Sequence, residues 1–190
     1  MKDRLLPAAI IPAILDLAIR NRLNVETLLH SAEVDPGVLS HSGTFVSVEQ
    51  QLKLFDAAYQ GMNNPAFGLL LGESIQYHSL DLVGQLIATS RNVQEALDEL
   101  FLFKDLVTPL TSFSLETLGF NAVLVYSVDR VLVKSNWIAH HDVMAASIFS
   151  IANAIIPQGL RLTKVRFVHT QPDYVDEYQR IFNTSVEFGC

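Results

Sequence analysis

The C-terminal stretch 161–190 most constrains the fold, because its apolar residues follow first a strand period and then a helix period. Val165, Phe167 and His169 alternate with their neighbours, which predicts a strand that ends at the turn Gln171-Pro172-Asp173. Apolar and aromatic residues then recur at helical spacing, at Tyr174, Tyr178, Ile181 and Phe182. Val186 and Phe188 start a second strand. A unit this small cannot bury its apolar faces alone, so the preceding residues must complete the core.

The N-terminal half predicts a series of short helices. Apolar residues recur at helical spacing from Leu6 to Leu17, and Pro12 either kinks this helix or marks its true start. Asn24 stands where it can cap a short following helix. In a later helix, Gly68-x-x-x-Gly72 predicts close packing against a neighbouring helix.

Two further helices carry capping-box spacing, in which a polar residue is followed by Glu or Gln three positions later. Ser47 with Gln50 opens the first, and Asn92 with Glu95 opens the second. The second leads into an apolar run that ends at Thr108-Pro109. The first half of the chain is therefore expected to be helical.

The pattern changes after position 110. Two alternating segments, around Phe113–Leu115 and Val123–Val128, are separated by a turn at 118–121, which predicts an antiparallel hairpin. A long helix is expected from Trp137 to Ile156. Its apolar stripe includes Met144, Ala145, Ile148, Ile151, Ala152 and Ile155.

These elements together predict an α+β fold. A helical N-terminal half is followed by a small, mainly antiparallel sheet in the order β-β-α-β-α-β, with the long helix packed on one face. No linker-like segment separates the two halves, so we expect residues 1–190 to form a single domain.

Composition limits the class of protein. Apolar residues make up 49% of the chain and charged residues 17%, which excludes a disordered chain. The apolar runs are shorter than a membrane span, and Asp16 and Arg20 interrupt the apolar start where a signal peptide would need a cleavage site. With a single cysteine, no internal disulfide is possible. We therefore expect a cytoplasmic protein without membrane contact. A net charge of −7 argues against DNA binding by this segment alone.

The C-terminal unit and one internal segment resemble the N-terminal effector-binding (arabinose-binding-like) domain of AraC/XylS-type transcriptional regulators, in the subgroup with a helical N-terminal half. The internal segment is 81–90, DLVGQLIATS, followed by a capped helix. The C-terminal match is carried by Val165, His169, Pro172, Tyr178, Phe182, Val186, Phe188 and Gly189.

The resemblance implies a ligand-sensing and dimerisation domain rather than an enzyme. It also implies a C-terminal DNA-binding domain with two helix-turn-helix units, so that this chain would be truncated before that domain and would reach DNA only through it. The expected partners are a small-molecule effector and a second copy of the chain in a homodimer.

The residues themselves show little catalytic chemistry. No phosphate-binding loop or nucleophile motif is present, and Cys190 has no local base. His140 and His141 are adjacent, so on a helix they diverge by about 100° and do not form a metal-ligand pair. We therefore expect no catalytic residue, metal or cofactor. A small cytoplasmic enzyme and a ligand-free protein-interaction module remain the alternatives.

An effector pocket is expected near the start of the long helix. Sensor pockets are mostly apolar with a few polar orienting groups. The expected lining is Phe101, Tyr126, Trp137, His141 and Met144. His140 should matter less than His141, because it points to another face. The alternative reading is that Trp137 is an aromatic anchor at the edge of the core.

Overall fold

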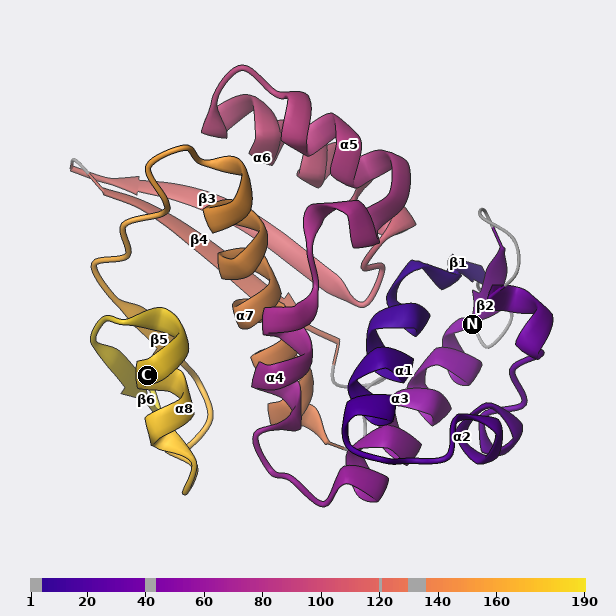
Figure 1. The fold of residues 1–190 in the computed structure, drawn as a ribbon. Helices are drawn as coiled ribbons and strands as arrows, with labels where there is room; N and C mark the ends of the chain where they lie inside the picture. Colours follow the sequence, from indigo (N-terminus) through magenta and orange to yellow (C-terminus); the bar gives the residue numbers. More distant parts are fainter. Residues whose placement is uncertain (1–4, 40–43, 120, 130–135) are drawn as a thin grey trace.

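A computed structural model describes residues 5–39, 44–119, 121–129 and 136–190 (Figure 1). Its N-terminal half contains two short strands and six α-helices: β1 Leu5–Pro7, α1 Ile11–Arg20, α2 Val25–Ser31, β2 Phe45–Ser47, α3 Val48–Met62, α4 Phe67–Ser74, α5 Asp81–Thr89 and α6 Val93–Phe103. The second half contains β3 Thr111–Leu118, β4 Asn121–Val128, α7 Trp137–Ile155, β5 Val165–Phe167, α8 Val175–Phe182 and β6 Val186–Phe188. Short 3-10 helices, η1 Ala8–Ile10, η2 Pro36–Leu39, η3 Tyr77–Leu80 and η4 Lys104–Leu106, connect some of these elements. The predicted α+β class is confirmed.

The first helix starts later than the apolar pattern suggests. Pro12 lies in the first turn of α1, where its missing N–H costs no hydrogen bond, so it marks the start rather than a kink. Leu5–Pro7 instead pairs antiparallel with Phe45–Ser47. The buried Leu6 satisfies both a helical and a strand pattern, which explains why the sequence did not separate the two.

The expected helix caps are present, with one difference. Ser47 and Gln50 form a reciprocal capping box, and the Asn24 side chain accepts from the Thr27 N–H at 2.9 Å. Asn92 accepts from the Glu95 N–H at 3.0 Å, but the Glu95 carboxylate accepts from the N–H of Arg91 instead of that of Asn92. In the second capping box, the hydrogen bond from the backbone to the Glu95 side chain therefore starts one residue earlier than expected.

The hairpin and the long helix are confirmed. β3 pairs antiparallel with β4, from Thr111 opposite Val128 to Leu118 opposite Asn121; Phe120, within the expected turn, lies outside the described residues. The four strands expected in one sheet instead form two separate two-stranded pairs among the described residues, β3 with β4 and β5 with β6. β5 and β6 are parallel, because α8 carries the chain back to the end where β5 began.

Helices α4 and α7 form the centre of the molecule (Figure 1). Gly68 and Gly72 face α7 so closely that a Cβ on them would lie 2.3 Å from the Ala139 carbonyl oxygen and 2.6 Å from that of Val143. The sequence motif therefore serves close helix packing, as predicted. One face of α7 joins the N-terminal helices, and another joins the aromatic core formed by β5, α8 and β6.

Candidate ligand-binding site

An apolar cavity of about 200 Å³ lies between the N-terminal helices, the hairpin and α7. Its walls come from β1, α1, α3, α5, α6, the start of β3 and α7. The polar side chains in the wall are Gln51, Ser79, Thr108, Thr111, His140 and Ser147. A mainly apolar enclosure with a few polar groups is the usual form of a small-molecule site.

Helix α7 supplies a continuous wall of this cavity. The lining residues on it recur at spacings of three and four, which places them on one face of the helix. They are His140, Val143, Met144, Ser147, Ile148, Ile151, Ala152 and Ile155. The opposite wall includes Ala96, Leu97 and Leu100 of α6. Most of the stripe read from the sequence therefore faces a cavity instead of a filled core.

His140 is the one titratable side chain among the described lining residues. Its ring stacks on Phe55, with the centroids 3.9 Å apart. Burial lowers the pKa of His140 to about 4, partly opposed by the charge of Asp56. The ring is therefore neutral at pH 7 and offers one hydrogen-bond donor and one acceptor.

A small set of hydroxyl side chains lies near the start of β3. The Thr108 hydroxyl is 2.8 Å from the Thr111 hydroxyl and 3.7 Å from the Met144 sulfur. The Ser147 hydroxyl donates to the Met144 carbonyl at 3.1 Å. These hydroxyl groups could orient a ligand without adding charge to the cavity.

Of the five residues expected to form the pocket, Met144 lies in the cavity wall. Phe101 lies behind the wall and stacks on the lining residue Phe113 at a centroid distance of 5.9 Å. Tyr126, Trp137 and His141 come together elsewhere: the Tyr126 hydroxyl donates to the His141 carbonyl at 3.1 Å, and the Trp137 ring meets the His141 ring edge-on at 4.4 Å. Contact between an effector and these four residues stays a prediction.

His140, not His141, lies in the wall of this cavity, and His141 is buried beside Trp137. The helical period does not separate the two residues, because His140 precedes Met144 by four positions and His141 by three, and both spacings place residues on one face of a helix. Sequence reasoning also missed the lining residues of α6 and β1, because no local pattern shows which apolar residues border an empty space.

A second cluster lies on the other side of α7, around the fully buried Asp142. Its carboxylate accepts hydrogen bonds from the hydroxyl groups of Tyr174, at 2.9 Å, and of Tyr178. His169 Nε2 lies 3.9 Å from the carboxylate, and His169 Nδ1 is 2.9 Å from the Thr170 carbonyl oxygen. Asp142 therefore links α7 to the C-terminal unit.

Electrostatics of this cluster follow from burial. Burial raises the pKa of the Asp142 carboxyl to about 7, although the two tyrosine hydrogen bonds oppose the change. Burial and the Asp142 charge raise the pKa of Tyr174 and Tyr178 above their usual range, and burial lowers that of His169. Near neutral pH, the protonated and ionised forms of Asp142 are therefore similarly populated.

Asp142→Asn is expected to remove a pH dependence of stability. Since the folded pKa lies above the ordinary 3.8, the stabilisation from Asp142 is full below about pH 4 and is lost as pH rises through about 7. The wild-type free energy of unfolding minus that of Asp142→Asn should fall by a few kcal/mol from pH 4.5 to 8.5, because one pKa unit corresponds to about 1.4 kcal/mol.

Urea unfolding at several pH values measures this difference. His140 and His169 have lowered pKa values, so they contribute stability that is lost as pH falls below about 6.5. The His140 contribution is common to both proteins and cancels, whereas that of His169, whose Nε2 lies 3.9 Å from the Asp142 carboxylate, is part of the measured difference below about pH 6.5. Parallel stability curves for the two proteins would show that Asp142 is already ionised when folded.

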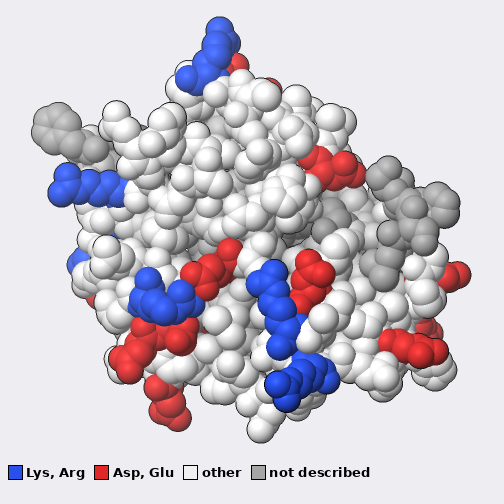
Figure 2. Space-filling view, viewed as in Figure 1, with Lys and Arg blue, Asp and Glu red and all other residues white. Residues whose placement is uncertain are grey.

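Surface charge is sparse over the upper part of the face in Figure 2 and denser below it. Arg180 of α8 bonds Glu73 of α4 at 2.7 Å and Glu177 at 2.9 Å, which adds a surface link between the C-terminal unit and α4. Among the described residues, no cluster of His, Cys, Asp or Glu could hold a metal ion. Within that same part of the chain, no helix has the length and hydropathy to cross a membrane.

Comparison with known families identifies the class. Residues 23–190 match the model of the arabinose-binding domain of AraC transcription regulators, at their N-terminus. The chain belongs to this family, as the C-terminal motif predicted. It is also 24% identical over 185 residues to the ornithine utilization regulator of Pseudomonas aeruginosa. That match covers 97% of this chain and 54% of the regulator, so the chain spans about half the length of its relative.

Proposed function

We propose that this chain is the ligand-sensing domain of a bacterial transcription regulator and that its effector binds in the cavity bordered by α7. The observation that carries the proposal is the apolar cavity in a domain of the AraC family. A role in binding fits this lining better than catalysis does, because acid–base chemistry needs placed titratable groups, and His140 is the one such group in the described wall.

The effector signal would pass through α7. A ligand in the cavity touches the face that carries His140 and Met144, while Asp142, on another face of the same helix, bonds Tyr178 of α8. A shift or rotation of α7 would therefore change the contacts of the C-terminal unit. Such a change biases two arrangements of the domain only if the ligand prefers one of them.

The remaining parts of the regulator are proposals from the family. DNA would be read by a separate C-terminal domain. The sensing domain described here would pair with a second copy of itself in a cytoplasmic homodimer. The net charge of −7 supports that division of roles, since a domain that binds the phosphates of DNA by itself is usually basic.

The identity of the effector does not follow from the relative. The name of the relative concerns ornithine utilization. Ornithine carries two ammonium groups and a carboxylate, whereas the described wall of this cavity carries no acidic or basic side chain other than His140. We therefore do not assign ornithine to this site.

Native mass spectrometry of the purified chain tests the proposed site, because a co-purified ligand adds mass. Ala152→Trp places an indole in the cavity wall, and Ala154→Trp makes the same change at an exposed position of the same helix. The added mass should persist in Ala154→Trp and disappear in Ala152→Trp. A ligand retained equally by both variants would place the site elsewhere.

The isolated chain is expected to bind no duplex DNA measurably at physiological salt. Fluorescence anisotropy with a labelled duplex, repeated at low salt, measures this. Micromolar binding that weakens steeply with salt would contradict the expectation, because that salt dependence reports phosphate contacts.

A further inference from the structure

The walls of the cavity, as far as the described residues form them, offer no charge to a ligand. Apart from the neutral His140, the described lining residues are apolar or carry only a hydroxyl or amide. A charged group placed there would lose its hydration without gaining an opposite charge. The cavity therefore disfavours both carboxylates and ammonium groups.

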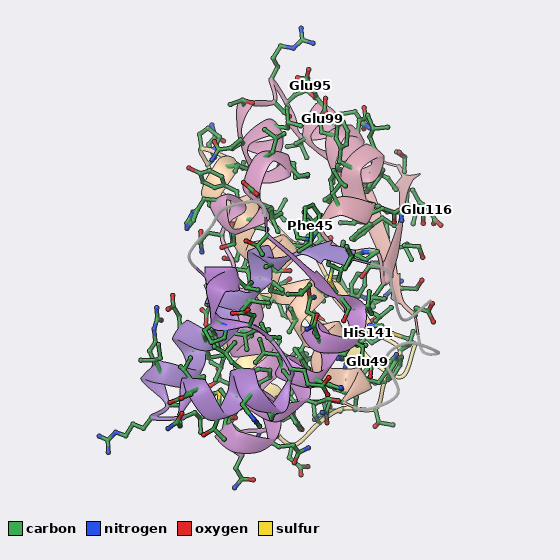
Figure 3. The ribbon with its side chains drawn as sticks, turned by 90° about the vertical axis from the view of Figure 1, so that its right-hand side faces the viewer. Phe45, Glu49, Glu95, Glu99, Glu116 and His141 are labelled. Carbon is green, nitrogen blue, oxygen red and sulfur yellow. The ribbon has the colours of Figure 1, made fainter. Side chains whose placement is uncertain are left out.

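Several charged side chains on the surrounding elements are engaged with one another or with polar neighbours outside the wall. Asp56 accepts from Asn136 at 2.8 Å, and the ion pairs Lys53–Glu33, Arg91–Glu95 and Lys104–Asp105 have N···O distances of 2.6, 3.0 and 2.6 Å. In Figure 3, Glu95 and Glu99 lie along the upper margin and Glu116 along the side. None of these side chains belongs to the lining, so they supply no counter-charge there.

Size and polar groups define the ligand further. A volume of about 200 Å³ exceeds that of an engineered apolar cavity of about 150 Å³ that holds a benzene ring. His140 offers one donor and one acceptor, and the Thr108 and Thr111 hydroxyl groups form a second polar position. One uncharged hydrogen-bonding group on the ligand would be satisfied at either position.

We propose that the cavity selects an uncharged, mainly apolar molecule with one hydroxyl or carbonyl group, and that it rejects amino acids and carboxylates. This inference rests on the proposed function, because it names the ligand class of the same site. Dispersion contacts with the α7 and α6 side chains supply the affinity, and the polar group sets the orientation.

Three probes with the same hydrocarbon chain separate charge from shape: 1-octanol, octanoate and octylammonium. Isothermal titration calorimetry of the purified chain at pH 7.4 measures their binding. We expect 1-octanol to bind at least ten times more tightly than either charged probe. Ala152→Trp should weaken 1-octanol binding at least tenfold, and Ala154→Trp should leave it within twofold of wild type.

The outcomes distinguish this inference from the proposed function. Octanoate or octylammonium binding as tightly as 1-octanol, and lost in Ala152→Trp, would overturn the ligand class and leave the cavity as the sensing site. If 1-octanol does not bind, or binds equally to Ala152→Trp, the inference is also overturned. The proposed function is then tested separately by native mass spectrometry of the co-purified ligand.

Discussion

Phe167→Ala is expected to destabilise the domain by about 3–5 kcal/mol, the usual range for removing a buried phenylalanine. Phe167 is 2% exposed and lies at the centre of the aromatic core between β5, α8 and β6. Its ring meets those of Tyr178, Phe182 and Phe188 at centroid distances of 5.1, 6.2 and 5.7 Å. Whole domains are stable by only about 5–15 kcal/mol, so the substitution should remove a large share of the stability and lower the melting temperature clearly.

Val168→Ala is the matched control, because Val168 is the next residue and is 63% exposed. Thermal and urea unfolding should show a large loss for Phe167→Ala and a change within about 0.5 kcal/mol for Val168→Ala. The reverse result would mean that the strand is shifted by one residue, since such a shift exchanges the two faces.

Local signals predicted much of this fold. The hairpin was predictable because its two alternating segments adjoin a short turn, and the long helix because its apolar stripe is continuous from Met144 to Ile155. Asn24 and Ser47 identified helix starts through bonds to residues three positions away. Each of these features depends on neighbours in the sequence.

Features that depend on distant partners were missed. Leu5–Pro7 forms a strand only because Phe45–Ser47 lies beside it, and each strand is too short for a clear period. The parallel pairing of β5 with β6 follows from the direction in which α8 returns the chain, which periodicity does not report.

The candidate site was predictable only in part, for a similar reason. Met144 was expected in the pocket and lies in the cavity wall, but the shape of an empty space depends on every element around it. In the sequence, Asp142 is only a polar residue on a helix. Its role depends on the hydrogen bonds from Tyr174 and Tyr178, which come from a distant part of the chain.

Helix α7 carries both a cavity wall and Asp142 and packs closely on α4, so the spacing of these two helices should be the most sensitive feature of the domain. Gly68→Ala is expected to cost at least about 3 kcal/mol, at the upper end of the range for overfilled cores. The new Cβ would lie 2.3 Å from the Ala139 carbonyl oxygen and 2.8 Å from the Asp142 Cβ. These neighbours belong to the body of α7, so the two helices must separate.

Gly61→Ala is the control, since it makes the same substitution in another helix, α3. There the new Cβ would lie 3.1 Å from a terminal methyl of Leu23, which can move. Alanine also favours helix over glycine by about 1 kcal/mol, so Gly61→Ala should be neutral or slightly stabilising. Urea unfolding of both variants measures the contrast. Equal stabilities would show that α4 and α7 tolerate a wider spacing, and α7 would then be a weak route from the cavity to Asp142.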